Sequence, residues 1–141
     1  MQKKISLALA FVLSVLWVSA AFASPNMQDG KWEITTTMDM KGLPVQMKPI
    51  KTTVCLDQKD VVPQKPQKNE DCKMISNKVE GNTVTWVMQC KDKNGTMDST
   101  GKITYKGNSF DGTVNMDING KQGKQHMAQK MSGKRIGDCT K

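Results

Sequence analysis

Four cysteines are the residues of this sequence best suited to chemistry. No Cys-x-x-Cys pair occurs among them, so neither a thioredoxin-like redox site nor a zinc ribbon is indicated. In a small exported chain, four cysteines are typical of two disulfides. We expect one bond between Cys55 and Cys72, which would close a proline-rich loop. We expect the other between Cys90 and Cys139, which would tie the last strand to the sheet.

Methionine is the second unusual residue type, and it has three explanations. Flexible thioethers fill an irregular apolar core, which is the role we expect here. They also make an adaptable lining for a ligand, and they are soft ligands for Cu(I). The candidate Cu(I) pairs are Met38-x-Met40 and Met88-x-Cys90. The methionines after the first residue are Met27, Met38, Met40, Met47, Met74, Met88, Met97, Met116, Met127 and Met131.

Catalysis is not indicated by the remaining polar residues. A nucleophile needs a neighbouring base, and His126 is the single histidine. The carboxylates are scattered over turns and over the polar positions of alternating segments. We therefore expect a protein that is not an enzyme and that carries neither a cofactor nor a metal centre.

The first 23 residues predict a secretory signal peptide, Met1–Ala23. Lys3 and Lys4 precede an apolar run, and Ala21-Phe22-Ala23 offers a cleavage site. The remaining residues, 24–141, are enough for a single β domain. We expect a periplasmic or secreted protein with no transmembrane segment after cleavage.

The charge of the chain argues against a nucleic-acid partner. Without the leader, 19 basic residues stand against 13 acidic ones, a net charge of +6. Only Arg135 is an arginine, and the lysines are scattered along the chain. Nucleic-acid binders concentrate positive charge on one face and favour arginine.

Four turn pairs position most of these residues. They are Gly81-Asn82, Asn94-Gly95, Gly107-Asn108 and Asn119-Gly120, each between segments of alternating polarity. Such pairs tolerate the positive φ of tight hairpin turns. If each is a two-residue loop, Glu80 faces Thr83, Lys93 faces Thr96, Lys106 faces Ser109 and Ile118 faces Lys121. The same counting puts Cys72 and Cys90 on opposite faces, which disfavours a bond between them.

The registers of the first three hairpins agree on one apolar face. Because a one-residue slip would invert every side chain, this agreement predicts the architecture. We expect an all-β, antiparallel up-and-down meander of about 7–8 strands, disulfide-stapled, which closes into a small barrel or a strongly curved sheet. The apolar face contains Ile75, Val79, Val84, Trp86, Met88, Cys90, Met97, Ser99, Gly101, Ile103, Tyr105, Phe110, Gly112, Val114, Met116 and Ile118.

The ends of the chain add three strands and a loop. Residues 31–40 and 50–56 alternate as strands, and Asp57 to Asp71 is a long loop with Pro63 and Pro66. The last strand has two possible phases. Strict register turns Met127 and Met131 inward with Gln125 and Gln129, whereas a bulge would turn His126 and Ala128 inward.

Three small residues interrupt the apolar face: Ser99, Gly101 and Gly112. They either hollow a pocket for an apolar ligand or admit the ring of Trp86 and let the strands bend. On the first explanation, the candidate ligand-binding residues are Trp86, Met88, Ser99, Gly101, Gly112 and Met116.

The chain resembles the exported bacterial domain-of-unknown-function family 3617. The pieces that carry the resemblance are Gly30-Lys31-Trp32-Glu33-Ile34, Thr53-Val54-Cys55-Leu56, Cys72, Trp86 with Cys90, Gly101-Lys102-Ile103-Thr104-Tyr105, Phe110-Asp111-Gly112, and Gly133 through Cys139. The resemblance implies a periplasmic or secreted protein of a Gram-negative bacterium, and it implies no activity.

The sequence therefore leads to three functional hypotheses. The first is a non-enzymatic binding protein for a small apolar ligand. The second is a structural or interaction protein of the cell envelope with a filled core and a protein partner. The third is Cu(I) binding through methionines.

Overall fold

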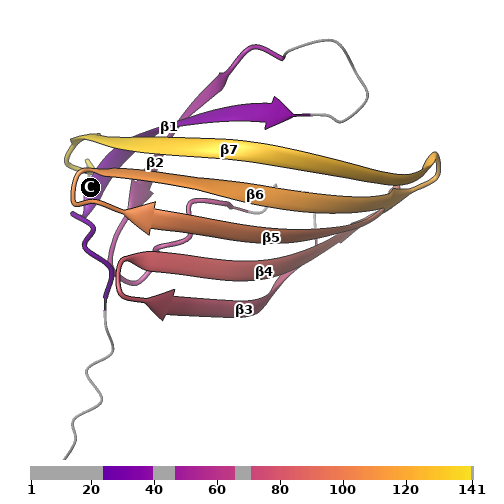
Figure 1. Ribbon diagram of the computed structural model, residues 1–141, viewed down its shortest axis with the longest axis horizontal. Helices are drawn as coiled ribbons and strands as arrows, with labels where there is room; N and C mark the ends of the chain where they lie inside the picture. The colour runs from indigo at the N-terminus through magenta and orange to yellow at the C-terminus, as the bar shows by residue number, and fades with distance from the viewer. Residues whose placement is uncertain (1–23, 40–46, 66–70, 141) are drawn as a thin grey trace, which may run out of the picture.

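The computed structural model describes residues 24–39, 47–65 and 71–140 (Figure 1). The expected signal peptide lies outside the described residues, and so does Met40. The described residues form seven strands and no helix. The strands are β1 (Gly30–Asp39), β2 (Ile50–Leu56), β3 (Asp71–Glu80), β4 (Thr83–Asp92), β5 (Gly95–Tyr105), β6 (Ser109–Gly120) and β7 (Gly123–Gly137).

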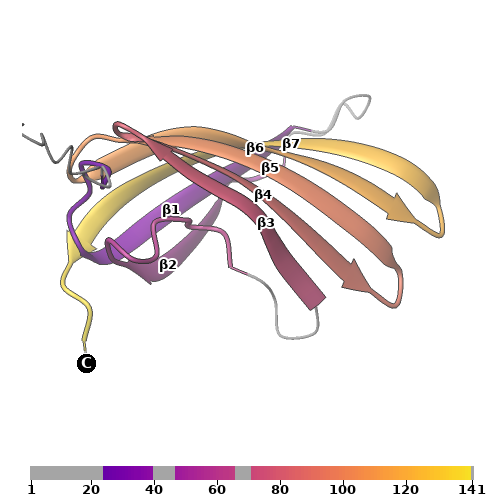
Figure 2. The ribbon, with the colours of Figure 1, turned by 90° about the horizontal axis from the view of Figure 1, so that it is seen from below.

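All seven strands form one antiparallel sheet with the order β2-β1-β7-β6-β5-β4-β3. The predicted meander is confirmed, because β3 to β7 pair consecutively. Of the two forms expected for the sheet, the closed barrel is wrong, because β2 and β3 remain edge strands. Figure 2 shows an arched sheet with the connection from β2 running beneath its concave side. Val61 and Val62 of this connection are buried, so chain fills the interior that closure would have enclosed.

Two of the four turns are displaced from their predicted positions, yet the buried face is unchanged. Cys90 pairs with Met97, because the turn lies at Lys93-Asn94. Ile118 pairs with Gln125, because the turn lies at Lys121-Gln122. These registers differ from the predicted ones by two and four residues. Even shifts preserve the face on which each side chain lies, since strand side chains alternate with period two.

Hydrogen bonds explain the displaced turn between β4 and β5. The Asp92 carboxylate accepts hydrogen bonds from the backbone N–H of Asn94 at 2.7 Å and of Gly95 at 2.9 Å. These bonds lower the pKa of Asp92 below its ordinary value, the bond from the Asn94 backbone most of all. The side chain thus selects a turn one residue earlier than the Asn-Gly pair predicted.

The predicted disulfides are wrong, and a β-bulge in β3 explains the error. The bonds are Cys72–Cys90 and Cys55–Cys139. The register of β3 against β4 shifts between Met74 and Ser76. Ile75 is the extra residue, and its side chain is 59% exposed rather than inward. One extra residue inverts every side chain before it, so Cys72 lies directly opposite Cys90.

Three aromatic rings form the centre of the core. Trp32, Tyr105 and Phe110 are buried, and their ring centroids are 5.4–5.9 Å apart. Tyr105 and Phe110 are cross-strand partners on the concave face. Edge-to-face pairs such as Tyr105 with Phe110 each add about 0.5–1.5 kcal/mol beyond the area they bury.

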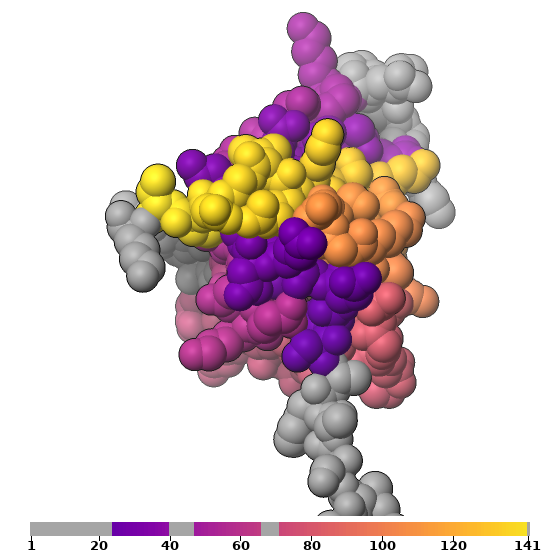
Figure 3. Space-filling model, turned by 90° about the vertical axis from the view of Figure 1, so that its left-hand side faces the viewer, coloured from indigo at the N-terminus to yellow at the C-terminus, as the bar shows by residue number. Residues whose placement is uncertain are grey.

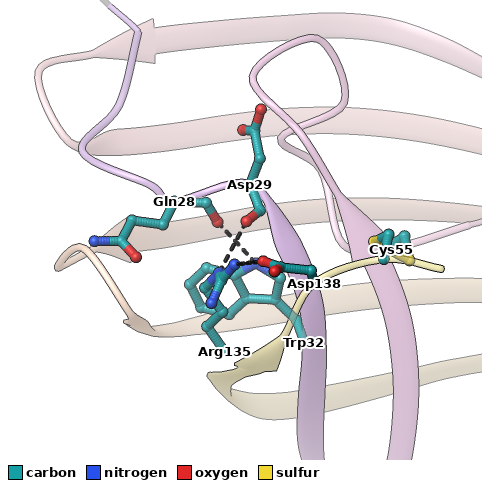
Figure 4. The surroundings of a disulfide bond; sticks show 7 residues. Gln28, Asp29, Trp32, Cys55, Arg135 and Asp138 are labelled. Atoms are coloured by element: carbon teal, nitrogen blue, oxygen red, sulfur yellow. Dashed lines mark hydrogen bonds and ion pairs between the residues drawn. A yellow bond between two sulfur atoms is a disulfide. The ribbon is translucent and has the colours of Figure 1, made fainter. Parts of the chain in front are cut away.

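The end of the sheet beside this aromatic cluster is sealed by the segment before β1, residues 24–29, which we call the N-terminal segment. Figure 3 shows this segment packed across the end of the sheet. The Trp32 indole N–H donates to the Gln28 carbonyl at 3.1 Å, and the Arg135 Nε donates to the Asp29 carbonyl at 2.8 Å (Figure 4). A Cβ on Gly30 would meet the backbone oxygen of Gly137 first and the Arg135 Nε next, and the φ of 150° is rarely adopted by other residues, so this position requires glycine.

Candidate functional site

The six predicted ligand-binding residues lie together on the concave face. Trp86 pairs with Gly101, and Met88 pairs with Ser99. Ser99 also pairs with Met116 on its other side. The register therefore brings the predicted residues into one patch, with Gly112 further along β6.

The patch is filled rather than hollow beside Trp86. A Cβ on Gly101 would lie 2.0 Å from the Trp86 ring atom Cζ2, so the indole occupies the space above this glycine. A Cβ on Gly112 would lie 2.2 Å from the Lys102 carbonyl oxygen. Both glycines are thus explained by close approach, of a ring in one case and of backbone in the other.

The connection after β2 is fastened to the same patch by hydrogen bonds. The Trp86 indole N–H donates to the Gln64 side-chain oxygen at 3.0 Å, and the Gln64 amide lies 3.5 Å from the Ser99 hydroxyl. The Tyr105 hydroxyl donates to the Val61 carbonyl at 2.7 Å. Burial raises the pKa of Tyr105 above its ordinary value of 10.0. Sequence reasoning missed Gln64, because a glutamine between prolines gives no signal that it faces a buried indole.

The concave face opens beyond Ser99, toward the β4–β5 and β6–β7 turns. A cavity of about 440 Å³ lies there. Its inner-face residues form one row across four strands: Cys90, Met97, Ile118 and Gln125. We call this cavity the distal trough. It shares no lining residue with the six predicted ligand-binding residues, although its row is adjacent to theirs.

The exposure of the methionines marks the boundary between the filled and the open part. Met88 and Met116 are 3% and 5% exposed. Met97 and Met127 are only partly buried, although both pack against the core. Methionine thus forms both the distal end of the core and the surface next to the trough. Its unbranched side chain adapts to either setting.

Two lysines and one aspartate are among the residues that line the distal trough. Lys91 and Lys121 line the trough, and neither forms an ion pair within the described part of the chain. Asp92 is the only acidic residue of the lining. Its carboxylate accepts the hydrogen bonds of the β4–β5 turn, which favour its ionised form, so its negative charge stays at the trough.

A second hollow, of about 630 Å³, lies on the convex face over β1, β5, β6 and β7. Hydroxyl groups and charged side chains dominate its lining, which includes Thr35, Thr37, Thr104 and Ser132. Lys106 and Asp111 form an ion pair of 2.7 Å there, and both side chains are more than 60% exposed. Exposed pairs of this kind contribute little.

The soft-metal hypothesis loses one of its two pairs. Cys90 is bonded to Cys72, so Met88-x-Cys90 has no thiolate to offer. Met40 of the other pair lies outside the described residues. His126 lies on the convex face, where its Nδ1 is 2.8 Å from Asp117. Of the two phases left open for the last strand, the strict one is present, with Met131 buried on the concave face. Among the described residues, no group of three or more His, Cys, Asp or Glu is placed to hold a metal.

The two disulfides indicate an oxidising, non-cytoplasmic compartment. None of the described segments is a helix long and apolar enough to cross a membrane. No curated protein and no solved structure matches the chain. One family model matches residues 27–139, which covers most of the chain and both disulfides. The chain therefore belongs to the family described as "Protein of unknown function (DUF3617)", as the resemblance of its motifs implied.

Proposed function

We propose that this chain is a non-enzymatic binding protein that holds a small apolar ligand in the distal trough. One observation carries the proposal. The concave face is packed from the end of the sheet where Trp32 lies to the cross-strand row of Ser99, and it is open on the far side of that row. Sheet faces that bury nothing are normally polar, whereas the floor of this opening is a disulfide, a thioether and an aliphatic side chain, with one amide, Gln125, beside them. An apolar concavity with a polar rim is the usual form of a small-molecule site.

The size of the trough supports the proposal. Small-molecule sites measure roughly 300–1,000 Å³, and the trough, at about 440 Å³, lies within that range. Cys90 is 3% exposed and forms a rigid floor with its partner Cys72. Met97 can change rotamer to follow the shape of a ligand. The proposal thus moves the site one row along the sheet from the six residues that the sequence favoured.

The proposed place of action is the periplasm or the outside of the cell. The features of a leader in residues 1–23 support this location, and the disulfides agree with it. A protein that carries an apolar molecule there would shield it from water.

Binding of a neutral apolar probe tests the proposed function. We expect N-phenyl-1-naphthylamine to fluoresce in the trough of the oxidised protein and Ile118→Asp to weaken that binding by about tenfold or more, because a carboxylate on an apolar floor must be desolvated. Asn119→Asp is the matched control. It adds the same charge one residue along β6, on the opposite face, and should leave binding unchanged.

Native mass spectrometry of the exported protein gives an independent measurement. A reproducible co-purified apolar mass supports the binding protein. A bare mass together with no probe fluorescence contradicts it. That result would favour the structural alternative, which the filled interior beside Trp86 and Gly101 supports.

A further inference from the structure

We propose that Met97 is an oxidation site, where a hydroperoxide converts the thioether to a sulfoxide and thereby releases the apolar ligand from the distal trough. This inference rests on the proposed function and names a regulation of the same site. Three features carry it: the state of the cysteines, the exposure of the methionines and the composition of the trough lining.

The cysteines leave an oxidant no free thiol to attack. All four are held in the bonds Cys55–Cys139 and Cys72–Cys90. Cysteine thiolates and methionine thioethers are the two side-chain groups that peroxides convert step by step. Because the thiolates are absent, the thioethers are the groups left to react.

The described methionines differ in how far an oxidant can reach them. Met47 and Met74 are 42% and 46% exposed. Met38, Met97 and Met127 are half-buried. The remaining four are buried: Met27, Met88, Met116 and Met131. A small peroxide therefore reaches Met97 in the folded protein, although more slowly than it reaches Met74.

Met97 is the one oxidisable side chain in the lining of the trough. Its neighbours on the floor are Ile118, which has no reactive atom, and Cys90, whose sulfur is already part of a disulfide. The described residues that line the trough include no other methionine and no tryptophan, tyrosine or histidine. Oxidation at this single sulfur is thus what changes the chemistry of the floor.

The step transfers one oxygen atom and two electrons. The hydroperoxide ROOH gives its terminal oxygen to the Met97 Sδ, so the O–O bond breaks, the sulfur–oxygen bond forms and the alcohol ROH leaves. The sulfur is oxidised and the peroxide is reduced, with no proton left over. An apolar ligand over the sulfoxide would remove water from a polar group and offer no hydrogen bond in return. A methionine sulfoxide reductase reverses the step.

Peptide mass spectrometry during titration with hydrogen peroxide locates the modification. We expect sulfoxide at Met74 first and at Met97 next, with none at Met88 or Met116 while the protein stays folded. N-phenyl-1-naphthylamine at several times its Kd should slow the oxidation of Met97 about fivefold and leave Met74 unaffected, because only the unoccupied trough is open to peroxide. Met97 that stays reduced after Met74 is fully oxidised overturns the proposal.

Variants connect the modification to binding. Oxidation of Met97 in the wild-type protein should weaken probe binding about fivefold or more, and a methionine sulfoxide reductase should restore it. Met97→Leu keeps an apolar side chain without sulfur, so it should bind the probe before and after treatment alike. Met74→Leu is the matched control, because it removes a more exposed thioether from outside the trough and should lose binding on treatment as the wild-type protein does.

The two proposals fail in different ways. Absence of probe binding to the untreated protein overturns the proposed function and, with it, the regulation. Binding that survives complete oxidation of Met97 overturns the regulation and leaves the binding protein intact. Equal losses of binding in treated Met97→Leu and treated wild-type protein also overturn it, because another residue would then be responsible.

Discussion

Gly101 lacks a side chain where the ring of Trp86 lies, and the same relation joins Gly133 to Phe110. At both positions a Cβ would approach an aromatic carbon to 2.0 Å. The sequence showed that Gly101 belongs to the apolar face, but it left open whether the glycine made space for a ligand or for a ring. Only the orientation of the indole, which depends on Gln64 across the concave side, decides between them.

Replacement of Gly101 tests this packing. Gly101→Ala should lower the free energy of unfolding by about 1–3 kcal/mol, because the ring must move to admit a methyl group. Gly120→Ala is the matched control. Its Cβ would meet only the Asn94 carbonyl oxygen, at an ordinary 3.5 Å. Denaturant unfolding followed by tryptophan fluorescence measures both, and equal losses would contradict the packing explanation.

Tyr105 gives a prediction for alkaline pH. It is the only tyrosine of the chain. Burial raises its pKa in the folded state above the ordinary value of 10.0. The unfolded chain therefore loses this proton at a lower pH than the folded chain, so the stability that Tyr105 contributes is complete below pH 10 and declines as the pH rises above it. Absorbance titration should show tyrosinate only together with unfolding. Tyrosinate in the folded protein near pH 10 would be the contrary result.

At the scale of elements, the alternation of side chains was predictable from sequence and the bulge was not. Two turns lie at other residues than predicted, but the same side chains face the core, because the pairings shifted by even numbers of residues. The single extra residue in β3 inverted one end of that strand and changed the disulfide pattern. Ile75 gives no local signal for a bulge, since neither glycine nor proline is near it. Counting outward from the turns thus fails where the register shifts by an odd number of residues.

Deletion of Ile75 tests the bulge. Ser76 and Met74 would then follow one another in a regular ladder, and Cys72 would still face Cys90. Little burial is lost, so we expect the free energy of unfolding to change by no more than about 1 kcal/mol. Thiol titration should find no free cysteine.

A deletion in the regular neighbouring strand provides the comparison. Deletion of Thr85 would turn either Val84 or Trp86 out of the core, because β4 has no bulge to absorb it. Cooperative unfolding should be lost. If the Ile75 deletion behaved like this one, the bulge would not be an independent insertion.

At the scale of the whole molecule, the sheet is an arch with a sealed end and an open end. The N-terminal segment, Arg135 and the aromatic rings seal one end, and the turns of β4–β5 and β6–β7 border the other. The membership of the family and the all-β meander followed from the sequence. The open edges did not, because no local pattern tells whether the first and last elements of a sheet meet across a filled interior.

Hydrogen exchange tests the order of the sheet. β5, β6 and β7 have neighbours on both sides, whereas β2 and β3 have one each. Amides of β5–β7 should exchange most slowly and those of β2 and β3 most rapidly, because edge amides are half unpaired. Exchange measured by mass spectrometry on peptides gives this ranking. Protection of β3 equal to that of β5 would show that another strand pairs with that edge.

The sequence separations of the two disulfides have a consequence for how the chain is assembled. Cys72 and Cys90 are 18 residues apart in one hairpin, whereas Cys55 and Cys139 are 84 apart. Along the chain, Cys72 and Cys90 both lie between Cys55 and its partner Cys139. Early oxidation of the nearby hairpin pair removes the two thiols that would otherwise capture it. Once the short crosslink has formed, Cys55 and Cys139 are the only cysteines left, so the long crosslink has a single possible pairing.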